Sequence, residues 1–380
     1  MKNLLFISHD TTRTGAPMVL LYLLRWIQVH QPQVKADVIA IRGGNMEGDF
    51  KNVCHNFYNY QECIKTQPLT ITQRILKKLK LFKLKDKKAV FINLMAANNY
   101  EVIYTNTVLS VPLGVEISKN SSNSKLIAHI HELQVIIKTL LPNLSNYLPN
   151  IDILIVPSKL VKQNLIARWN IQKEKVKVVY ECAKVSEKDT VFNTQKNKKK
   201  FVVGASGMVH WRKGYDIFLL VANHINKHYP KADITFQWIG KLPKSIAPII
   251  DEDIRKLQLE NNVTFVGEVN NTAPYFNAFD VFLMTSREDP FPLVCIEVGL
   301  IGKPIISFDQ AVGTNEILKE GGGFIVPYLD IVAMAEHVMV YYNESEIKDS
   351  HGAQNKKSFS KFTPELICPQ LYEIIEKHLK

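Results

Sequence analysis

Short apolar segments alternate with helical patterns along most of the chain, and this alternation limits the fold more than any other feature of the sequence. We expect strands at 3–8, 36–41, 101–106, 125–130, 151–158 and 175–180. Helical patterns at 18–28 and 158–169 fall between these strands. Because strand–helix alternation builds a parallel sheet with helices on both faces, the first half of the chain predicts a doubly wound α/β domain.

The alternation restarts after a polar, Lys-rich interruption near 187–200, with strands expected at 201–207, 234–240, 263–268, 281–286, 303–308 and 322–327. The 380 residues therefore predict an N-terminal Rossmann-like domain at 1–188, a linker at 189–200 and a C-terminal Rossmann-like domain at 201–358. A final helix is expected within 359–380, since Thr363–Pro364 is a typical helix start. Two such domains leave a cleft between them, and open α/β sheets bind ligands at the carboxyl ends of their strands.

The composition is that of a globular protein, with 46% hydrophobic and 22% charged residues. The longest apolar runs are too short to span a bilayer, and the first residues read as a strand rather than a signal peptide. Five cysteines are scattered singly, which argues against a disulfide framework or a zinc site. We therefore expect a reducing, cytoplasmic location and no metal site.

Much of the net charge of +11 lies in residues 73–88, where Arg74 and seven lysines face only Asp86. Leucines and a phenylalanine interleave with the lysines, as in a basic amphipathic helix on an anionic membrane surface. We expect peripheral association with the inner face of the membrane through this stretch, and a solvated surface helix is the alternative. Nucleic acid is not an expected partner, because no recognisable reading motif accompanies the charge.

Small residues open the first helix directly after the first strand, at Gly15 and Ala16. Such a start lets the backbone approach an anion, which the free N–H groups of the first helical turn can bind. A lone glycine is more often only a turn, and the chain lacks the G-x-G-x-x-G pattern of dinucleotide-binding domains. The sequence therefore favours an anion site here and argues against a dinucleotide-dependent dehydrogenase.

Two histidines, His129 and His131, alternate at the end of the strand expected at 125–130. We expect the two side chains to point to opposite sides of the extended chain, with one imidazole in the core and the other toward the ligand. His131 is the better site candidate, because it lies at the strand end. A structural, hydrogen-bonded histidine is the alternative.

A glycine-rich loop follows the strand at 201–207 and leads to Arg212, Lys213 and Gly214. Arg offers a fork of donors and Lys offers a mobile point charge, a combination that suits a diphosphate. The alternative is a solvated basic loop. A triplet of acids at 251–253 looks like a metal-binding group, but we interpret it as negative charge at a helix amino terminus.

Acidic residues flank an apolar run in SREDPFPLVCIEVGLIGKP, residues 286–304. We expect a helix from Leu293 to Leu300, ended by Gly302, with Asp289 in the preceding loop and Glu297 on the helix. A buried unpaired carboxylate is costly, so these acids either lie at the solvent edge of a core element or bind a ligand, and both can face the cleft. Carboxylates accept hydrogen bonds from vicinal hydroxyls, and loop N–H groups at Phe291, Leu293 and Val294 serve as donors. These groups together suggest a nucleotide-sugar.

The segment DPFPLVCIEVGLIGKPI resembles the E-x7-E motif of the retaining GT-B glycosyltransferases of glycosyltransferase family 4, with Asp289 and Glu297 as its two acids. The resemblance also covers TGAP after the first strand, the HE at 131–132, the RKG loop at 212–214, FVGEV at 265–269 and GGGFIVP at 321–327. It thus extends over nearly the whole chain. It implies a GT-B fold, two doubly wound domains facing across a cleft, with the C-terminal helix crossing back to the first domain.

The resemblance also implies site residues. Catalytic roles fall on His131, Arg212, Lys213 and Asp289. Binding of the donor nucleotide and sugar falls on Gly15, Ala16, Val266, Gly267, Glu288, Phe291, Pro292, Leu293, Val294 and Glu297. The chain departs from the family pattern at three places, because it has Asp289 beside Glu288 for the first glutamate, Pro292 for a glycine and Met208 for an arginine.

The implied reaction is transfer of a hexose, with retained anomeric configuration, to a glycan or lipid-linked glycan in polysaccharide biosynthesis. The implied donor is a UDP-sugar, UDP-glucose in particular, and no cofactor or metal is expected. Two alternatives stay open. One is another enzyme on the same fold, a nucleotide-sugar epimerase or a sugar phosphorylase. The other is a non-catalytic scaffold that binds nucleotide-sugars.

Overall fold

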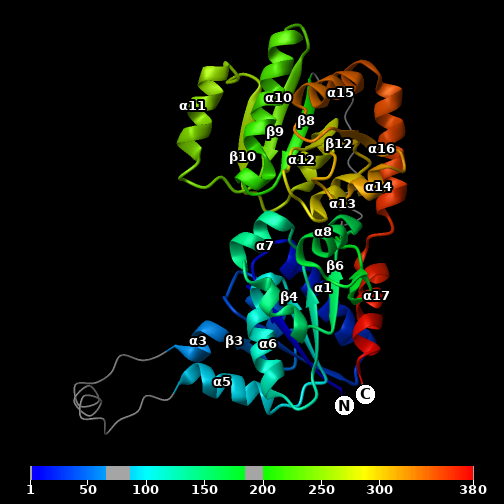
Figure 1. Ribbon diagram of the computed structural model, residues 1–380. Coiled ribbons are helices and arrows are strands. Elements are labelled where there is room, and N and C mark those ends of the chain that lie inside the picture. Colours follow the sequence, from blue (N-terminus) through cyan, green and yellow to red (C-terminus); the bar gives the residue numbers. More distant parts are fainter. Residues whose placement is uncertain (1, 66–85, 185–199, 380) are drawn as a thin grey trace, which may run out of the picture. The chain divides into compact units, whose positions relative to one another are not determined.

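The computed structural model describes residues 2–65, 86–184 and 200–379, which form two compact α/β units. Unit 1 comprises Met1–Val156, Leu165–Val179 and Cys368–Lys380, and unit 2 comprises Pro157–Asn164 and Tyr180–Ile367 (Figure 1). The linker expected at 189–200 lies outside the described residues except for Lys200. Most of the basic stretch at 73–88 also lies outside them, and only its last three residues are described.

Unit 1 contains a seven-stranded parallel sheet in the order β3-β2-β1-β4-β5-β6-β7. Its strands are β1 (Lys2–Ser8), β2 (Val34–Ala40), β3 (Phe57–Asn59), β4 (Val102–Asn106), β5 (Lys125–His129), β6 (Ile153–Val156) and β7 (Val176–Val178). Its helices are α1 (Gly15–His30), α2 (Glu47–Lys51), α3 (Tyr60–Ile64), α5 (Lys87–Ala96), α6 (Val111–Asn120) and α7 (Gln134–Leu140). Two further helices, α8 (Lys159–Trp169) and α17 (Pro364–Glu376), have residues assigned to each unit.

Unit 2 contains a six-stranded parallel sheet in the order β10-β9-β8-β11-β12-β13. Its strands are β8 (Phe201–Ser206), β9 (Ile234–Ile239), β10 (Val263–Gly267), β11 (Val281–Met284), β12 (Ile305–Phe308) and β13 (Gly323–Val326). Its helices are α10 (Tyr215–His228), α11 (Ala247–Leu257), α12 (Ala273–Ala278), α13 (Leu293–Leu300), α14 (Asn315–Leu318), α15 (Ile331–Asn343) and α16 (Ser345–Phe359). The expected α/β class with two Rossmann-like sheets is confirmed.

The strand order reverses once in each sheet, between β1 and β4 in unit 1 and between β8 and β11 in unit 2. Right-handed crossovers place the helices on opposite faces on the two sides of such a reversal. The loops at the carboxyl ends therefore diverge, and the crevice that they leave is where doubly wound sheets bind ligands. The fold thus singles out the loops after β1, β4, β8 and β11.

The central strands are buried because helices cover both faces of each sheet. In β1, Leu5, Phe6 and Ile7 have no exposed surface, and all five residues of β4 are buried. Burial of each such side chain contributes about 1.5–3 kcal/mol. The tail is tied into unit 1 through α17, where the Tyr372 ring lies 5.5 Å from the Trp26 ring of α1. These packed layers hold the strand ends, and hence the loops beyond them, in fixed positions.

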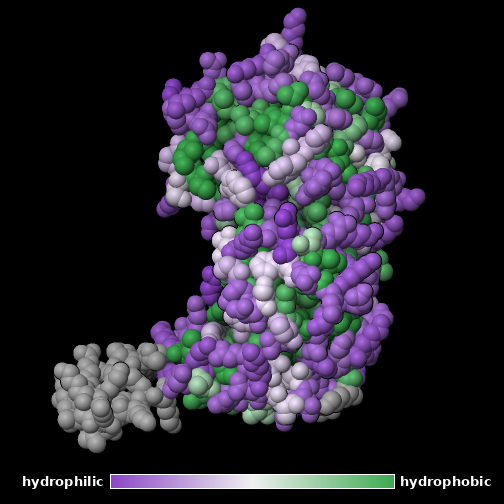
Figure 2. Space-filling model, viewed as in Figure 1, coloured by the Kyte–Doolittle hydropathy of each residue, from purple (hydrophilic) through white to green (hydrophobic). Residues whose placement is uncertain are grey.

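The surface of each unit mixes hydrophilic and hydrophobic side chains on the face that Figure 2 shows. Among residues 2–65, 86–184 and 200–379, no helix combines the length and hydrophobicity needed to cross a bilayer.

One interpretation made from the sequence is wrong. The acids at 251–253 do not begin a helix, because α11 begins at Ala247 and has no acidic residue in its first turn. They lie in the second turn, where they are too far in to cap the helix.

Candidate functional site

The first anion-binding candidate lies at the start of α1 in unit 1. The helix begins at Gly15, as predicted, and its N-cap residue Thr14 makes no side-chain capping bond. The first N–H groups of a helix have no intrahelical acceptor, so those of this turn are open to a ligand. Gly15 is exposed and Ala16 is half-buried. The geometry therefore permits the predicted approach of an anion.

A third residue joins the helix start to His131. The Asn106 side chain, at the end of β4, donates from Nδ2 to the Ala16 carbonyl oxygen at 2.9 Å. Its Oδ1 lies 2.8 Å from Nε2 of His131. Asn106 is only 1% exposed. The structure thus brings together the predicted residues Ala16 and His131 through a residue that the sequence analysis missed.

The expectation that His129 and His131 point to opposite sides is wrong, because their ring centroids lie 3.8 Å apart. Residues two positions apart lie on the same face of extended chain, so the spacing itself favours neighbouring rings, although β5 ends at His129. His129 is buried, and burial together with the neighbouring His131 holds its pKa well below the ordinary value. Burial also lowers the pKa of His9, after β1, and His131 lowers it further. Both of these imidazoles are therefore neutral at physiological pH.

Two features fix the loops around His131. The Glu132 carboxylate accepts hydrogen bonds from the N–H groups of His131 at 3.0 Å and Val108 at 3.2 Å, which ties the loop after β5 to the loop after β4. Thr107 has a φ of 90°, a conformation that costs a residue other than glycine about 1–3 kcal/mol. Such strain persists only where the surroundings over-determine it, and it is common at functional sites.

In unit 2, the predicted catalytic residues form one ion cluster. Lys213 Nζ lies 2.6 Å from Oδ2 of Asp289, and Arg212 Nη1 lies 3.4 Å from Oδ1. Ser286 donates to the same carboxylate at 3.1 Å. Burial by itself would raise the pKa of Asp289, but Lys213 and Arg212 outweigh it and hold this pKa below the ordinary value. The carboxylate is therefore charged before any ligand arrives.

The cluster separates the roles of the two neighbouring acids. Asp289 is 5% exposed and directs its carboxylate at both cations. Glu288 contributes its backbone carbonyl, which accepts from Arg212 Nη1 at 2.7 Å. The backbone of Asp289 is bound in turn to the loop after β12, through its N–H to Ala311 and its carbonyl to the N–H of Gly313. Asp289 is thus the acid that the fold holds against the cationic loop.

A second ion pair, which the sequence analysis missed, locks the two loops of unit 2 together. Arg287 binds Asp216 through two parallel hydrogen bonds, of 2.9 and 2.7 Å. Its guanidinium lies 5.1 Å from the centre of the Trp211 ring and also donates to the Trp211 carbonyl at 2.8 Å. Bidentate pairs of this kind fix orientation as well as adding attraction. Arg212 and Lys213 are therefore held by a loop that cannot swing freely.

Glycines with positive φ end three neighbouring strands of unit 2. Gly207 follows β8 with a φ of 136°, Gly240 follows β9 with 144°, and Gly267 ends β10 with 90°. A Cβ at Gly240 would collide with the Gly207 carbonyl oxygen, and a Cβ at Gly207 would lie 3.1 Å from the Lys213 side chain. Of these, only Gly267 was predicted from the sequence, together with its half-buried neighbour Val266. The edge beside Lys213 therefore exposes backbone rather than side chains.

The helix α13 runs from Leu293 to Leu300, as predicted, and Gly302 beyond it has a φ of 81°. Pro292 is the N-cap residue and no side chain caps the helix, so the first-turn N–H groups of Leu293 and Val294 are open to a ligand. Phe291 packs its ring into the core, 5.2 Å from the ring of Tyr180. Phe291 can therefore contribute to binding only through its backbone.

The second acid of the motif, Glu297, differs from Asp289 because its pKa is raised rather than lowered. Burial raises its pKa to about 7. Its carboxylate makes no hydrogen bond or ion pair with any residue in the described part of the chain. Burial is also the main reason that the pKa of the Cys295 thiol is raised to about 12, and both Asp289 and Glu297 add to this rise. An unpaired acid in such a place is costly unless a ligand supplies its partners.

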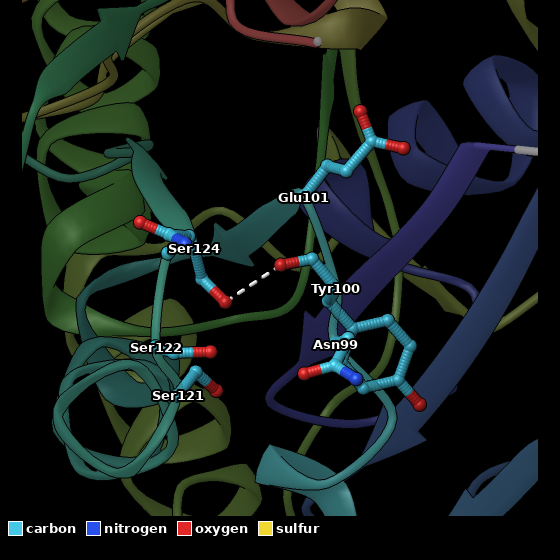
Figure 3. Close-up of a pocket in the computed structure, with 7 residues that line it drawn as sticks. Asn99, Tyr100, Glu101, Ser121, Ser122 and Ser124 are labelled. Atoms are coloured by element: carbon cyan, nitrogen blue, oxygen red, sulfur yellow. Dashed lines mark hydrogen bonds between the residues drawn. The ribbon is translucent and has the colours of Figure 1, made fainter.

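A separate hollow of about 210 Å³ lies at the opposite edge of the sheet of unit 1. Figure 3 shows Ser124 donating its hydroxyl to the carbonyl oxygen of Tyr100, at 2.6 Å, across this hollow. Its lining residues precede β4 and β5 and are Asn99, Tyr100, Glu101, Ser121, Ser122, Asn123 and Ser124. Since doubly wound sheets bind ligands at the carboxyl ends of their strands, we assign it no role in the site.

Comparison with known proteins places this geometry in a class. Residues 200–344 match the sequence model of the family described as Glycosyl transferases group 1. The structure of Anabaena Alr3699/HepE in complex with UDP and glucose matches with a TM-score of 0.79 and 20% identity, over 99% of this chain and all of that one. With GT-B neighbours such as this one covering nearly the whole chain, the chain has the GT-B fold class.

Two curated relatives are each similar to about half of this chain. An uncharacterized 41.2 kDa protein in the cps region of Klebsiella pneumoniae is 28% identical over 199 residues, 49% of this chain and 52% of that protein. The amylovoran biosynthesis glycosyltransferase AmsD of Erwinia amylovora is 25% identical over 187 residues, 49% of this chain and 50% of that protein. The chain spans about half the length, or less, of the curated relatives that it matches first.

Proposed function

We propose that the protein is a glycosyltransferase that moves a hexose from a UDP-sugar to a glycan, in the biosynthesis of a polysaccharide, with retention of anomeric configuration. The observation that carries the proposal is the combination, in unit 2, of the Lys213–Asp289–Arg212 cluster with the unpaired Glu297. The match of residues 200–344 to a glycosyltransferase family supports it. So does the similarity to AmsD.

In this proposal the donor binds through complementary charges and hydroxyl acceptors. Lys213 and Arg212 neutralise the diphosphate as it departs, which is where negative charge develops in the transition state. The open N–H groups at the start of α13 add donors for phosphate or sugar oxygens. Glu297 accepts hydrogen bonds from the two ribose hydroxyls, which replace the partners that it lacks. Asp289 accepts from sugar hydroxyls and keeps the two cations in position.

Retention follows, in the proposal, from attack on the face that the leaving group occupies. The departing phosphate then takes the proton of the acceptor hydroxyl while the new glycosidic bond forms. His131 is assigned to the reacting sugar, as the family resemblance implies. Since two fixed side-chain cations meet the diphosphate, we propose that the transfer needs no metal ion or other cofactor.

The acceptor that we propose is a glycan or a lipid-linked glycan at the cytoplasmic membrane face. The predicted membrane contact through 73–88 stays a prediction. It can be tested by sedimentation with anionic vesicles of a variant in which Lys77, Lys78, Lys80 and Lys83 are replaced by glutamine. Unchanged sedimentation of this variant would remove the membrane contact from the proposal and leave the transfer reaction untouched.

A donor screen tests the proposed function. Thermal unfolding is measured with UDP, UDP-glucose, UDP-galactose, UDP-N-acetylglucosamine and GDP-mannose, because a ligand that binds only the folded state raises its melting temperature. The donor that stabilises the protein is then assayed for transfer and for hydrolysis. Release of UDP that requires an added glycan, and an α-linked product from an α-linked donor, is the expected result.

The alternatives give different products in the same assay. An epimerase would interconvert two UDP-sugars, a phosphorylase would release sugar phosphate only when phosphate is present, and a scaffold would bind the donor without turnover. Glu297→Ala and Lys213→Ala should each abolish most of the transfer. If both variants retain wild-type rates, the site assignment is wrong.

A further inference from the structure

Asn106 lies at the strand reversal of unit 1, and its side chain is bound at both ends. It is the last residue of β4, next to β1 on one side and β5 on the other, and it pairs with His129 in the sheet register. Its amide nitrogen donates to the Ala16 carbonyl oxygen in the first turn of α1, and its amide oxygen lies 2.8 Å from His131 Nε2. One buried amide therefore joins three segments that are far apart in the sequence.

The two contacts place a hydrogen on Nε2 of His131. The Ala16 carbonyl oxygen has lone pairs and no proton, so only the Nδ2 end of the amide can face it. The Oδ1 end must then face His131, and an amide oxygen can only accept. Nε2 of His131 is therefore the donor and carries a hydrogen. In the neutral ring, Nδ1 is then the nitrogen that holds the lone pair.

The surroundings prevent the amide from turning over. Asn106 is buried, and the next residue, Thr107, is held at a φ of 90° by its N–H bond to the His129 carbonyl oxygen at 2.8 Å. The Glu132 carboxylate binds the N–H groups of Val108 and His131, and so fixes the backbone on both sides of the contact. A rotated amide would place two acceptors together at Ala16 and would lose one hydrogen bond at this end.

We propose that Asn106 is a positioning residue that holds His131 in the Nε2–H tautomer and fixes its ring to the first turn of α1. The proposal deepens the proposed function and rests on it, because His131 is the residue assigned to the reacting sugar. Asn106 acts through His131 and is assigned no contact with the donor. The imidazole is then held in one orientation, with its Nε2–H directed at the Asn106 amide oxygen.

The first experiment measures the tautomer directly and needs no substrate. Protein labelled with 15N-histidine is examined by NMR, and the signals of His131 are identified by their loss in His131→Gln. We expect Nε2–H in the wild type and a shift toward Nδ1–H in Asn106→Leu, which has a similar volume and no polar atoms. Thr105→Val is the matched control, since it removes one buried hydrogen bond from the neighbouring residue of β4 and should leave the His131 signals unchanged.

Asn106→Asp separates the two contacts and keeps the test valid if Asn106→Leu fails to fold. Its carboxylate still accepts from His131 Nε2 but cannot donate to Ala16, so the Nε2–H signal should persist. Persistence of the wild-type tautomer in folded Asn106→Leu would overturn the proposal, and so would loss of Nε2–H in Asn106→Asp.

The second experiment measures transfer. In Asn106→Leu we expect kcat to fall about 10- to 100-fold, with the KM for the donor changed less than about 3-fold, because the loss is in orientation rather than binding. Asn106→Asp should recover part of kcat, and Thr105→Val should match the wild type. A loss confined to KM would contradict a positioning role. If the wild type transfers no sugar from any donor while the tautomer result holds, the proposed function fails and the assignment of Asn106 stands.

Discussion

The carboxyl edges of the two sheets use different chemistry to hold their side chains. In unit 1 the groups around His131 are an amide at Asn106, buried imidazoles whose protonation is disfavoured, and the Glu132 carboxylate, which binds backbone N–H groups. In unit 2 the edge is ionic, with Lys213 and Arg212 on Asp289 and Arg287 on Asp216. The backbone differs in the same way. Unit 1 has a strained threonine, Thr107, where unit 2 has glycines.

This difference shows that two sheets of the same topology can carry different polar groups at the carboxyl ends of their strands. Hydrogen bonds between uncharged groups, such as the Asn106 amide and the buried imidazoles, orient side chains without attracting counter-ions and depend little on salt. An ionic edge that is already paired has its charges in position before the ligand arrives, so little reorganisation is needed when negative charge develops on a diphosphate. The sequences of the loops, rather than the sheets, decide which type of edge forms.

The largest effect that would test this difference between the two units is expected from removing Lys213, one of the two cations of unit 2. Lys213→Ala should lower kcat about 100- to 1,000-fold, equivalent to about 3–4 kcal/mol, because one fixed charge on the leaving group is lost. Lys227→Ala, an exposed lysine on α10 of the same unit, is the control and should leave kcat unchanged. Steady-state kinetics with the donor found in the screen measure both. A loss below 5-fold for Lys213→Ala would mean that the ionic edge does not stabilise the leaving group.

The glycines of unit 2 come next in expected effect. Gly214 has a φ of 71°, and a Cβ there would collide with the Thr285 carbonyl oxygen, so Gly214→Ala should lower the free energy of unfolding by about 3 kcal/mol. Gly267 also has a positive φ, 90°, but a Cβ there would meet no atom within 4 Å. Gly267→Ala should therefore cost only the conformational penalty, about 1 kcal/mol. Urea unfolding of both variants measures the difference, and equal losses would show that the close approach at Gly214 carries no cost.

Glu297 should make the free energy of unfolding depend on pH. Its pKa in the folded protein is about 7, above the ordinary 4.5, so the folded state binds the proton more tightly than the unfolded state. Glu297 is therefore without penalty below pH 4.5, and its penalty grows until the pH exceeds 7. Glu297→Gln should raise the free energy of unfolding by about 2 kcal/mol at pH 8 and hardly at all at pH 4.5.

The same substitution should weaken donor binding, since the amide replaces a carboxylate that accepts from two hydroxyls. Urea unfolding at the two pH values and a donor titration at pH 8 check both effects. A variant that is no more stable at pH 8 than the wild type would show that another group already satisfies Glu297.

The smallest effect is expected at the strained residue of unit 1. Thr107→Gly relieves a φ of 90° but adds freedom to the unfolded chain, so the free energy of unfolding should rise by about 1 kcal/mol or less. Transfer should nevertheless fall, because the loop between Asn106 and Val108 loosens. Thermal unfolding and kcat are the measurements. A clear loss of stability would show that Thr107 is not strained, and this difference between the backbones of the two units would then disappear.

The sequence was sufficient to predict the architecture, because the central strands of parallel sheets are continuous apolar runs that stand out from their neighbours. It also located the start of α1 at Gly15 and the helix from Leu293 to Leu300, since both begin and end at residues with strong local preferences. Arg212, Lys213 and Asp289 were predicted as one site, and the structure joins them in one cluster.

What the sequence could not show were contacts that depend on strand order. Asn106 meets His131 only because β4 and β5 are neighbours, and an asparagine at a strand end gives no signal by itself. Asp216 and Arg287 come together because β8 pairs with β11, across 71 residues of chain. The opposite directions predicted for His129 and His131 were wrong, because residues two positions apart in extended chain lie on the same face.

The row formed by Gly207, Gly240 and Gly267 has a consequence for how such a protein can change over evolutionary time. A ligand seated on this row would meet peptide N–H and C=O groups, which every amino acid except proline supplies. Most point mutations therefore leave the groups that recognise the ligand unchanged. A side chain at Gly240 is not tolerated in any case, because its Cβ would collide with the neighbouring backbone. New preferences for a ligand would have to arise in the flanking side chains, while the part of the molecule held by the glycines stays the same.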